Sequence, residues 1–160
     1  RLFLRMSAVD EAGWSTGDSS AVARVLKTHG VDVIDCSAGG MSDASTGDVP
    51  PSYGYQVPYA RAIRAGADIK TMAVGMIIHA DQAEEIISSG GADLVALGRE
   101  FLHNPNWPID AAQKAGVPSP FAHVTQQYAY WLEKRANNKI GIKSSTWQRG
   151  IHDGAGEKVS

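Results

Sequence analysis

The sequence has little of several features that mark other classes of protein. It contains one cysteine, Cys36, which excludes an intramolecular disulfide and a metal site built from several cysteines. Its 15 Lys and Arg against 17 Asp and Glu leave no cationic excess for nucleic-acid phosphates or an anionic membrane. The longest apolar stretches, such as residues 71–79, fall well short of the roughly 20 residues that a membrane-spanning helix needs, and the start does not have the pattern of a secretory signal. We therefore expect a cytoplasmic globular protein with neither nucleic acid nor a membrane as partner.

What the sequence does contain is a repeat of short apolar runs, each followed by a segment with helical spacing. Strands are expected at residues 2–8, 31–36, 69–76 and 92–97, and helices between residues 15 and 30 and at 58–65, 80–88 and 107–115. Three predicted strands begin with similar four-residue sequences, which are Gly30-Val-Asp-Val, Gly66-Ala-Asp-Ile and Gly91-Ala-Asp-Leu. In each, the glycine is expected to end a helix and the Asp to stand at the start of a strand. The repeat predicts the α/β class, with four successive β/α units in a parallel sheet, or half of an eight-fold barrel.

The rest of the sequence divides into a long loop and a different C-terminal part. Residues 41–56 are rich in Ser, Asp, Gly and Pro and exceed the usual length of a connection inside a compact domain. This favours a binding role over a solvated surface excursion. We expect residues 1–118 to form the barrel portion, residues 119–135 an aromatic segment at a subunit interface, and residues 136–160 a polar docking tail with a mobile end.

Ligand sites in parallel β/α architectures lie where the strands end, and three segments of this sequence qualify. Arg5 stands in an apolar strand and needs either an anionic ligand or an acidic side chain as partner, and the residues favour neither reading. Gly75 and Gly98 lie at the tips of two consecutive predicted strands, where glycine lets backbone N–H groups approach a ligand. Arg99 offers a guanidinium fork suited to phosphate oxygens. Each segment alone is equally typical of a tight turn with a surface charge, but the two together favour a phosphate site.

Other polar residues give weaker signals. Cys36 is either a reactive thiol or, more commonly for such a cysteine, a small buried hydrophobic residue. Asp35 beside it is explained equally well by capping, by pairing or by a functional role. The histidines at positions 29, 79, 103, 123 and 152 do not have metal-ligand spacing, so no metal site is expected.

Six segments of the chain, taken together and in order, resemble one known family. They are Leu2-Phe-Leu-Arg-Met-Ser-Ala8, Tyr53-Gly-Tyr-Gln-Val-Pro-Tyr59, Ala73-Val-Gly-Met76, Ala83-Glu-Glu-Ile86, Ala92-Asp-Leu-Val-Ala-Leu-Gly-Arg-Glu100 and Asn104-Pro105. The sequence resembles the Old Yellow Enzyme family over roughly residues 1–132, and is most similar to its branch of bacterial-type ene-reductases and xenobiotic reductases.

The resemblance implies a fold, a cofactor and a reaction. Family members are (β/α)8 TIM barrels in which FMN takes hydride from NAD(P)H and passes it to the β-carbon of an activated alkene. By this resemblance Arg5 is the catalytic arginine of strand five, lying against the pyrimidine side of FMN and stabilising the anionic reduced flavin. The residues matching the grip on the FMN phosphate, after strands seven and eight, are Val74, Gly75, Met76, Gly98 and Arg99.

The resemblance also implies partners. The chain corresponds to about strands five to eight, and the family's strand-one and strand-three flavin contacts, substrate-binding pair and tyrosine proton donor have no counterpart in it. A complete barrel takes about 250 residues, so we expect a chain or segment carrying strands one to four to complete the site. In the similar branch a C-terminal segment reaches a neighbouring protomer, which suggests a homo-oligomer contacting through Trp131, or through Tyr128 or Tyr130. The alternative is that this aromatic cluster packs on its own barrel.

Two rival functions remain open on the sequence. The chain could stand alone as a half-barrel module that binds FMN or another phosphate ligand without catalysis. It could also belong to a TIM-barrel enzyme that binds a sugar phosphate and no flavin, although that reading leaves Arg5 and the match at residues 53–59 unexplained.

Overall fold

The computed structural model describes residues 1–39 and 52–137, and the described residues form two compact units. The first unit covers residues 1–105 and contains a four-stranded sheet with its helices. The second begins at Asn106 and contains two helices in its described part. In the described part of the chain, no helix is long and apolar enough to cross a membrane.

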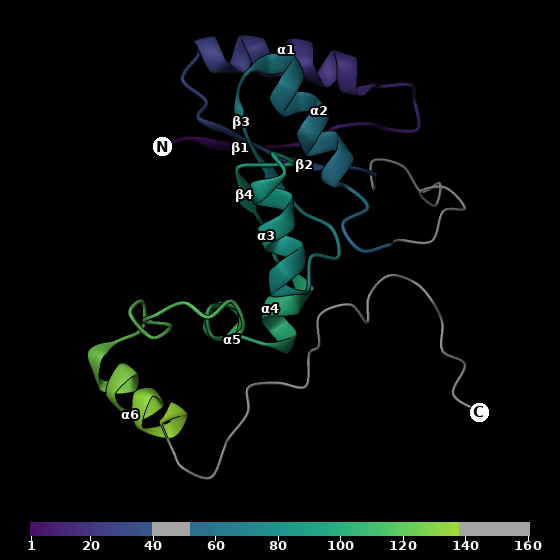
Figure 1. Ribbon diagram of the computed structural model, residues 1–160. Helices are drawn as coiled ribbons and strands as arrows, with labels where there is room; N and C mark the ends of the chain where they lie inside the picture. Colours follow the sequence, from purple (N-terminus) through teal and green to yellow (C-terminus); the bar gives the residue numbers. More distant parts are fainter. Residues whose placement is uncertain (40–51, 138–160) are drawn as a thin grey trace, which may run out of the picture. The chain divides into compact units, whose positions relative to one another are not determined.

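The sheet of the first unit is parallel throughout. Its strands are β1 (Phe3–Ser7), β2 (Val33–Ser37), β3 (Lys70–Ala73) and β4 (Leu94–Val95). They lie side by side in the order β1-β2-β3-β4 (Figure 1). In the register of the ladder, Arg5 lies opposite Asp35, and Asp35 lies opposite Met72.

A helix follows each strand. In order they are α1 (Thr16–Thr28), α2 (Val57–Ala67), α3 (Ala80–Ser88) and the short α4 (Arg99–His103). α1 begins with a capping box, because the Ser15 hydroxyl accepts from the Asp18 N–H while the Asp18 carboxylate accepts from the Ser15 N–H. Strand–helix alternation with strictly parallel neighbours confirms the predicted α/β class with successive β/α units.

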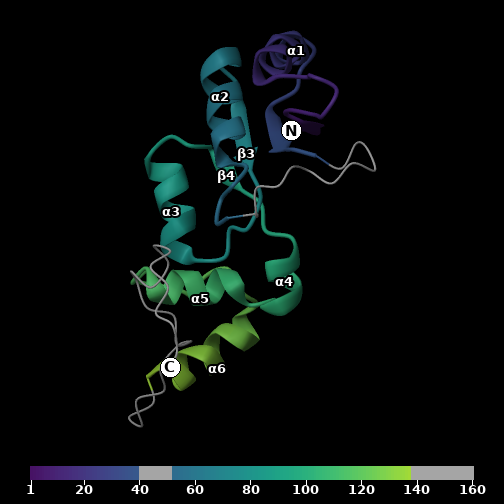
Figure 2. The same ribbon diagram turned by 90° about the vertical axis from the view of Figure 1, so that its right-hand side faces the viewer.

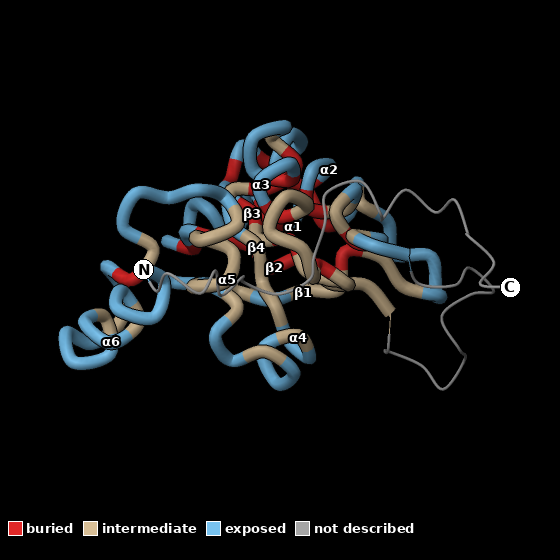
Figure 3. The backbone as a smooth tube through the Cα atoms, turned by 60° about the horizontal axis from the view of Figure 1, so that its bottom comes forward, coloured by how far each residue is buried: buried red, intermediate tan, exposed pale blue. Residues whose placement is uncertain are grey.

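The helices cover one face of the sheet. α1 packs along α2, α2 lies on β2 and β3, and α3 lies beside β4 (Figures 1 and 2). Ile34 and Cys36 of β2 and Thr71 and Ala73 of β3 have no exposed surface and alternate with the residues of the opposite face. Figure 3 shows the buried segments gathered where these strands and helices meet.

The opposite face of the sheet is more open. Phe3 at one edge strand is 46% exposed and Leu94 at the other is 40% exposed, although both are large apolar residues. Arg5 and Lys70 lie on this same face and are also exposed. These exposed side chains leave the face that carries Arg5 open within the first unit.

α1 and α2 approach each other closely at Gly66. A Cβ at this position would lie 2.7 Å from the Ser20 Oγ, which is closer than real Cβ contacts. The prediction that Gly66 ends its helix is therefore wrong: α2 continues through Ala67, and Asp68 takes the left-handed conformation at φ 49°. Gly66 is explained by helix packing, whereas Gly30 does follow the end of α1 with φ 90° as predicted.

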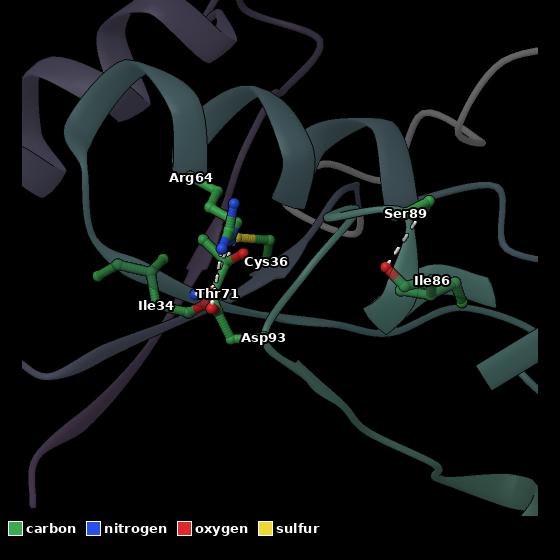
Figure 4. A network of polar contacts seen from close by, with 7 residues as sticks. All are labelled: Ile34, Cys36, Arg64, Thr71, Ile86, Ser89 and Asp93. Atoms are coloured by element: carbon green, nitrogen blue, oxygen red, sulfur yellow. Dashed lines mark hydrogen bonds and ion pairs between the residues drawn. The ribbon is translucent and has the colours of Figure 1, made fainter. Parts of the chain in front are cut away.

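Aspartates stand at the starts of strands, as the sequence repeat predicted, and two of them bind cations of earlier helices. Asp93, just before β4, accepts two bonds from Arg64 of α2, at 2.9 and 3.2 Å, and one from the Thr71 N–H of β3 at 3.0 Å (Figure 4). Asp68, just before β3, pairs with Lys27 of α1 at 2.8 Å. These contacts fix where the strands begin.

Two strands, β3 and β4, are much shorter than predicted. β3 ends at Ala73 instead of residue 76, because the backbone turns through left-handed conformations at Gly75 (φ 109°) and Met76 (φ 49°). β4 contains two residues, which pair with Met72 and Ala73. The end of β3 thus also limits the length of β4.

The second unit contains α5 (Trp107–Lys114) and α6 (Gln126–Ala136). α5 confirms the predicted helix, with proline in its first turn. No helix was predicted at α6 or α4. α6 is mostly polar and aromatic without a clear apolar stripe, and α4 is only one turn long. The predicted tail at residues 136–160 lies, from residue 138 onward, outside the described residues.

Candidate functional site

The ends of β3 and β4 bring together the two glycine segments that the sequence singled out. The Ala96 N–H donates to the Ala73 carbonyl at 2.8 Å, so the segments that follow β3 and β4 leave the sheet next to each other. Residues 74–76 follow β3, and residues 96–99 follow β4 and lead into α4. Both predicted phosphate-binding segments therefore lie at the carboxyl edge of the sheet, where parallel β/α folds bind ligands.

Gly75 occupies a position that other residues would not tolerate. Its φ is 109°, and a Cβ there would lie 3.0 Å from the Tyr55 ring and 3.2 Å from the Gln56 Cγ. The neighbouring Met76 carbonyl accepts from the Gly54 N–H at 3.3 Å and from the Gln82 Nε2 at 3.0 Å. Contacts from the start of α2 and from α3 thus hold the turn in shape.

Gly98 and Arg99 are open to solvent and to ligands. No atom lies within 4 Å of the position that a Cβ would occupy on Gly98, so its backbone can be approached closely. Arg99 is exposed and forms no ion pair with any residue that the structure describes. An accessible backbone beside an unpaired guanidinium suits a phosphate group, so these residues fit the phosphate of the implied cofactor.

Arg5 lies on the open face of the sheet and reaches across to β2. Its Nη1 is 3.5 Å from the Asp35 Oδ2, and its Nε donates to the Ser37 Oγ at 3.4 Å. The Arg5 side chain is nevertheless 59% exposed. The pairing expected as one alternative is therefore present, and the exposed part of the guanidinium is still accessible to an anionic ligand.

Asp35 and its neighbour Cys36 point to opposite faces of β2 and are both buried. Burial raises the pKa of the Asp35 carboxyl, and the Arg5 charge opposes that rise. Its Oδ1 is buried and accepts no hydrogen bond from the described residues. Burial, with a further contribution from the Asp35 charge, raises the pKa of the Cys36 thiol to about 12, which favours its interpretation as a small core residue.

The aromatic residues expected at a subunit interface lie in the second unit, on α6. Tyr128 is 67% and Trp131 65% exposed, and the Lys134 ammonium lies 4.6 Å from the centre of the Tyr130 ring. Their proposed intermolecular role stays a prediction. Of the long loop at 41–56, residues 41–51 lie outside the described residues, so its expected binding role stays a prediction as well.

Two residues of this region were missed by sequence reasoning. Ser37 holds the Arg5 Nε, and its place two residues after Asp35 on the same strand was the available signal, because residues i and i+2 share a face. Gln56 packs on Gly75 with its side chain buried, a contact that sequence spacing does not reveal. Among the described residues, no group of three or more His, Cys, Asp and Glu could hold a metal ion.

Comparison with known proteins identifies relatives of this chain. Residues 1–116 match the NADH:flavin oxidoreductase / NADH oxidase family. The NADPH dehydrogenases of Halalkalibacterium halodurans and Geobacillus thermodenitrificans are 45% and 48% identical over 118 residues, which is 72% of this chain and 34% of each relative. That of Bacillus subtilis is 42% identical over 123 residues, 74% of this chain and 36% of its own length.

The chain spans about a third of the length of the curated relatives that it matches. The match nevertheless covers the whole first unit, including Arg5, the turn at Gly75 and the segment at Gly98 and Arg99. It confirms the resemblance drawn from the six sequence segments, and the family implies a TIM-barrel fold. The chain belongs to the NADH:flavin oxidoreductase / NADH oxidase family.

Proposed function

We propose that this chain supplies the FMN-binding portion of an NAD(P)H-dependent oxidoreductase that reduces activated alkenes. The observation that carries the proposal is the convergence of Gly75 and Gly98 with Arg99 at the carboxyl ends of adjacent strands, in a chain of this family. When bound, FMN supplies the hydride-transfer chemistry. The names of the relatives, NADPH dehydrogenases, support NADPH as the reductant.

The residues of this chain have separate tasks in the proposed site. The backbone at Gly75 and Gly98 and the Arg99 guanidinium bind the phosphate, where fixed donors compensate its charge. Arg5 presents its exposed guanidinium edge to the ring system from the open face of the sheet. A cation held there stabilises negative charge that develops during reduction, which makes Arg5 the catalytic residue of this portion.

The proposal includes a partner for the sheet. Four parallel strands are half the number in a TIM barrel, and the edge strands β1 and β4 have one described neighbour each. We propose that a chain or segment carrying barrel strands one to four pairs with both edges and covers the open face at Phe3 and Leu94. Substrate and proton-donor groups would come from that part, and exposed α6 would contact another protomer.

The test combines this chain with the first four β/α units of a curated relative, for example the NADPH dehydrogenase of Bacillus subtilis. The purified complex is expected to show flavin absorbance and to oxidise NADPH with an activated enone as acceptor. Arg99→Ala should lower FMN retention about tenfold, because one charge-assisted contact to phosphate is lost. Arg61→Ala removes an exposed arginine of α2 that donates to the Ser89 hydroxyl at 3.2 Å and has no assigned contact with the phosphate, and it serves as the control.

The outcomes separate the rival functions. A complex that binds FMN but does not oxidise NADPH would favour a binding module without catalysis. A stable complex without any flavin, retaining a sugar phosphate instead, would favour the non-flavin enzyme. Equal FMN retention in the Arg99→Ala and Arg61→Ala complexes would contradict the assigned phosphate site.

A further inference from the structure

The Arg5 side chain is held on the open face by two side chains of the neighbouring strand. Arg5 lies opposite Asp35 in the parallel ladder, and Ser37 lies two residues further along β2 on the same face. The guanidinium contacts both, through Nη1 to the Asp35 carboxylate and through Nε to the Ser37 hydroxyl. Ser37 lies toward the carboxyl end of β2, the same end of the sheet at which the ligand segments follow β3 and β4.

The two side chains of this ion pair differ greatly in conformational freedom. The Asp35 side chain is 10% exposed and sits on a central strand, whereas the Arg5 side chain is 59% exposed on an edge strand. An exposed arginine has several rotatable bonds and loses considerable entropy when it is fixed. A carboxylate that is buried and fixed can therefore act as the anchor, and the arginine is the group whose position it determines.

Few other charged groups compete for Asp35. The groups around it are Arg5 from β1, Lys70 from β3 on the same face, and the un-ionised Cys36 thiol beside it on β2. Asp35 Oδ1 accepts no hydrogen bond from the described residues, so its single ionic contact is with Arg5. Helix α2 packs on β2 and β3 from the face that carries Ile34, Cys36, Thr71 and Ala73, opposite the face of Asp35.

We propose that Asp35 is a positioning residue for Arg5, fixing its guanidinium on the open face of the sheet so that its outer edge is directed to the ligand. Asp35 itself touches neither cofactor nor substrate in this proposal and acts only through Arg5. The ligand part of the proposal rests on the proposed function, whereas the restraint of Arg5 by Asp35 does not.

The first arm of the test measures the restraint directly, by ¹⁵N NMR of the Arg5 Nε–H in the full chain without FMN. The wild type is expected to show a restrained side chain, and Asp35→Asn a mobile one with an order parameter below about 0.6. Asp35→Glu should restore part of the restraint. Asp68→Asn, which breaks the exposed pair with Lys27, is the matched control and should leave Arg5 unchanged.

A pH titration of the wild type keeps this arm independent of mutant folding. Because burial raises the Asp35 pKa, lowering the pH protonates Asp35 and should release Arg5 with a midpoint above the usual aspartate range. The transition should be absent from Asp35→Asn. An Arg5 signal that is mobile in the wild type, or unchanged in both Asp35→Asn and the titration, would overturn the proposal.

The second arm measures the dissociation constant of FMN in the completed barrel described above. Asp35→Asn is expected to weaken FMN binding about fivefold in the wild-type background and to have no further effect in the Arg5→Ala background. An equal loss in both backgrounds would show that Asp35 acts independently of Arg5 and would overturn the proposal. If no variant binds FMN, the proposed function fails, and the NMR arm alone decides the role of Asp35.

Discussion

Cys36 has no exposed surface, and its thiol pKa is raised to about 12. The thiolate is the form that reacts with alkylating reagents. At pH 8 we expect iodoacetamide to modify the native chain about 10³-fold more slowly than the chain unfolded in denaturant, where the thiol has an ordinary pKa. Mass spectrometry of quenched samples measures both rates, and similar rates would contradict the buried position.

The same shift gives Cys36 a pH-dependent effect on stability. The folded chain keeps its thiol proton between about pH 9 and 12, whereas the unfolded chain loses it, so the unfolded state binds fewer protons in this window. The free energy of unfolding should therefore fall as the pH rises through this range. The Cys36→Ala variant has no thiol to titrate and should not show this component of the fall.

Gly75 and Gly98 are expected to respond differently to the same substitution. Gly75→Ala places a Cβ 3.0 Å from the Tyr55 ring at a φ of 109°, which should lower the free energy of unfolding by about 2 kcal/mol. Gly98→Ala has open space and a negative φ, so stability should be nearly unchanged while FMN binding weakens. Chemical denaturation and FMN titration of both variants check this contrast, and equal stability losses would contradict it.

The site shows where prediction from single residues ends. Glycine and arginine at consecutive strand ends predicted the segments at Gly75 and Gly98 that the structure brings together. The sequence left two readings of Arg5 open, because the choice depends on the register between β1 and β2, and Arg5 and Asp35 are far apart in the chain. Only the paired strands reveal that Arg5 contacts an acidic side chain and is exposed as well.

Among the elements, the pair of helices α1 and α2 depends on the small size of Gly66. Gly66→Ala would place a Cβ 2.7 Å from the Ser20 Oγ and push the helices apart, with an expected loss of about 1–3 kcal/mol in the free energy of unfolding. Ser20→Ala in the same chain should recover part of this loss, because the nearest contacting atom is removed. Gly17→Ala, in the first turn of α1 with a contact at 3.4 Å, is the control.

Thermal or chemical denaturation measures the four proteins, which are the wild type, Gly66→Ala, Gly66→Ala with Ser20→Ala, and Gly17→Ala. A stabilising effect of Gly66→Ala would mean that Gly66 serves the helix end, as its sequence pattern first indicated, and not the packing of α1 on α2. In that case alanine would gain by its higher helix propensity.

The bounds of a helix or strand were predictable where residues within or next to that element determine them. α3 begins and ends at the predicted residues because its apolar spacing and the glycines after it act locally. The end of β3 could not be predicted, since Val74 and Met76 continue its apolar run and the turn is held by Tyr55 and Gln56 from a distant segment. Gly66 was misread for the same reason, because its neighbour Ser20 belongs to another helix.

For the whole molecule, the edges of the sheet are the places where the proposed barrel would continue. β1 and β4 are edge strands, whereas β2 and β3 have a neighbour on each side. In hydrogen exchange we expect slow exchange of β2 and β3 amides and faster exchange of β4, which has two residues. Adding the complementary strands of a relative should slow exchange selectively in β1 and β4.

The oligomeric state of the isolated chain gives an independent check on the hydrogen-exchange result. The isolated chain exposes Phe3 and Leu94 and should self-associate in size-exclusion chromatography, and the complement should convert it to a defined complex. A stable monomer whose edge amides are unaffected by the complement would contradict the half-barrel proposal and favour an independent module.

The ion pairs at the strand starts repeat with the architecture. Lys27 in the last turn of α1 holds Asp68 before β3, and Arg64 in the last turn of α2 holds Asp93 before β4. The first two β/α units thus supply the cations, and the third and fourth supply the aspartates, so each ion pair joins a unit to the second unit after it. In evolutionary terms, a gene duplication that adds one such unit leaves its ion pair incomplete until a further unit follows, which favours growth of the sheet by more than one unit at a time.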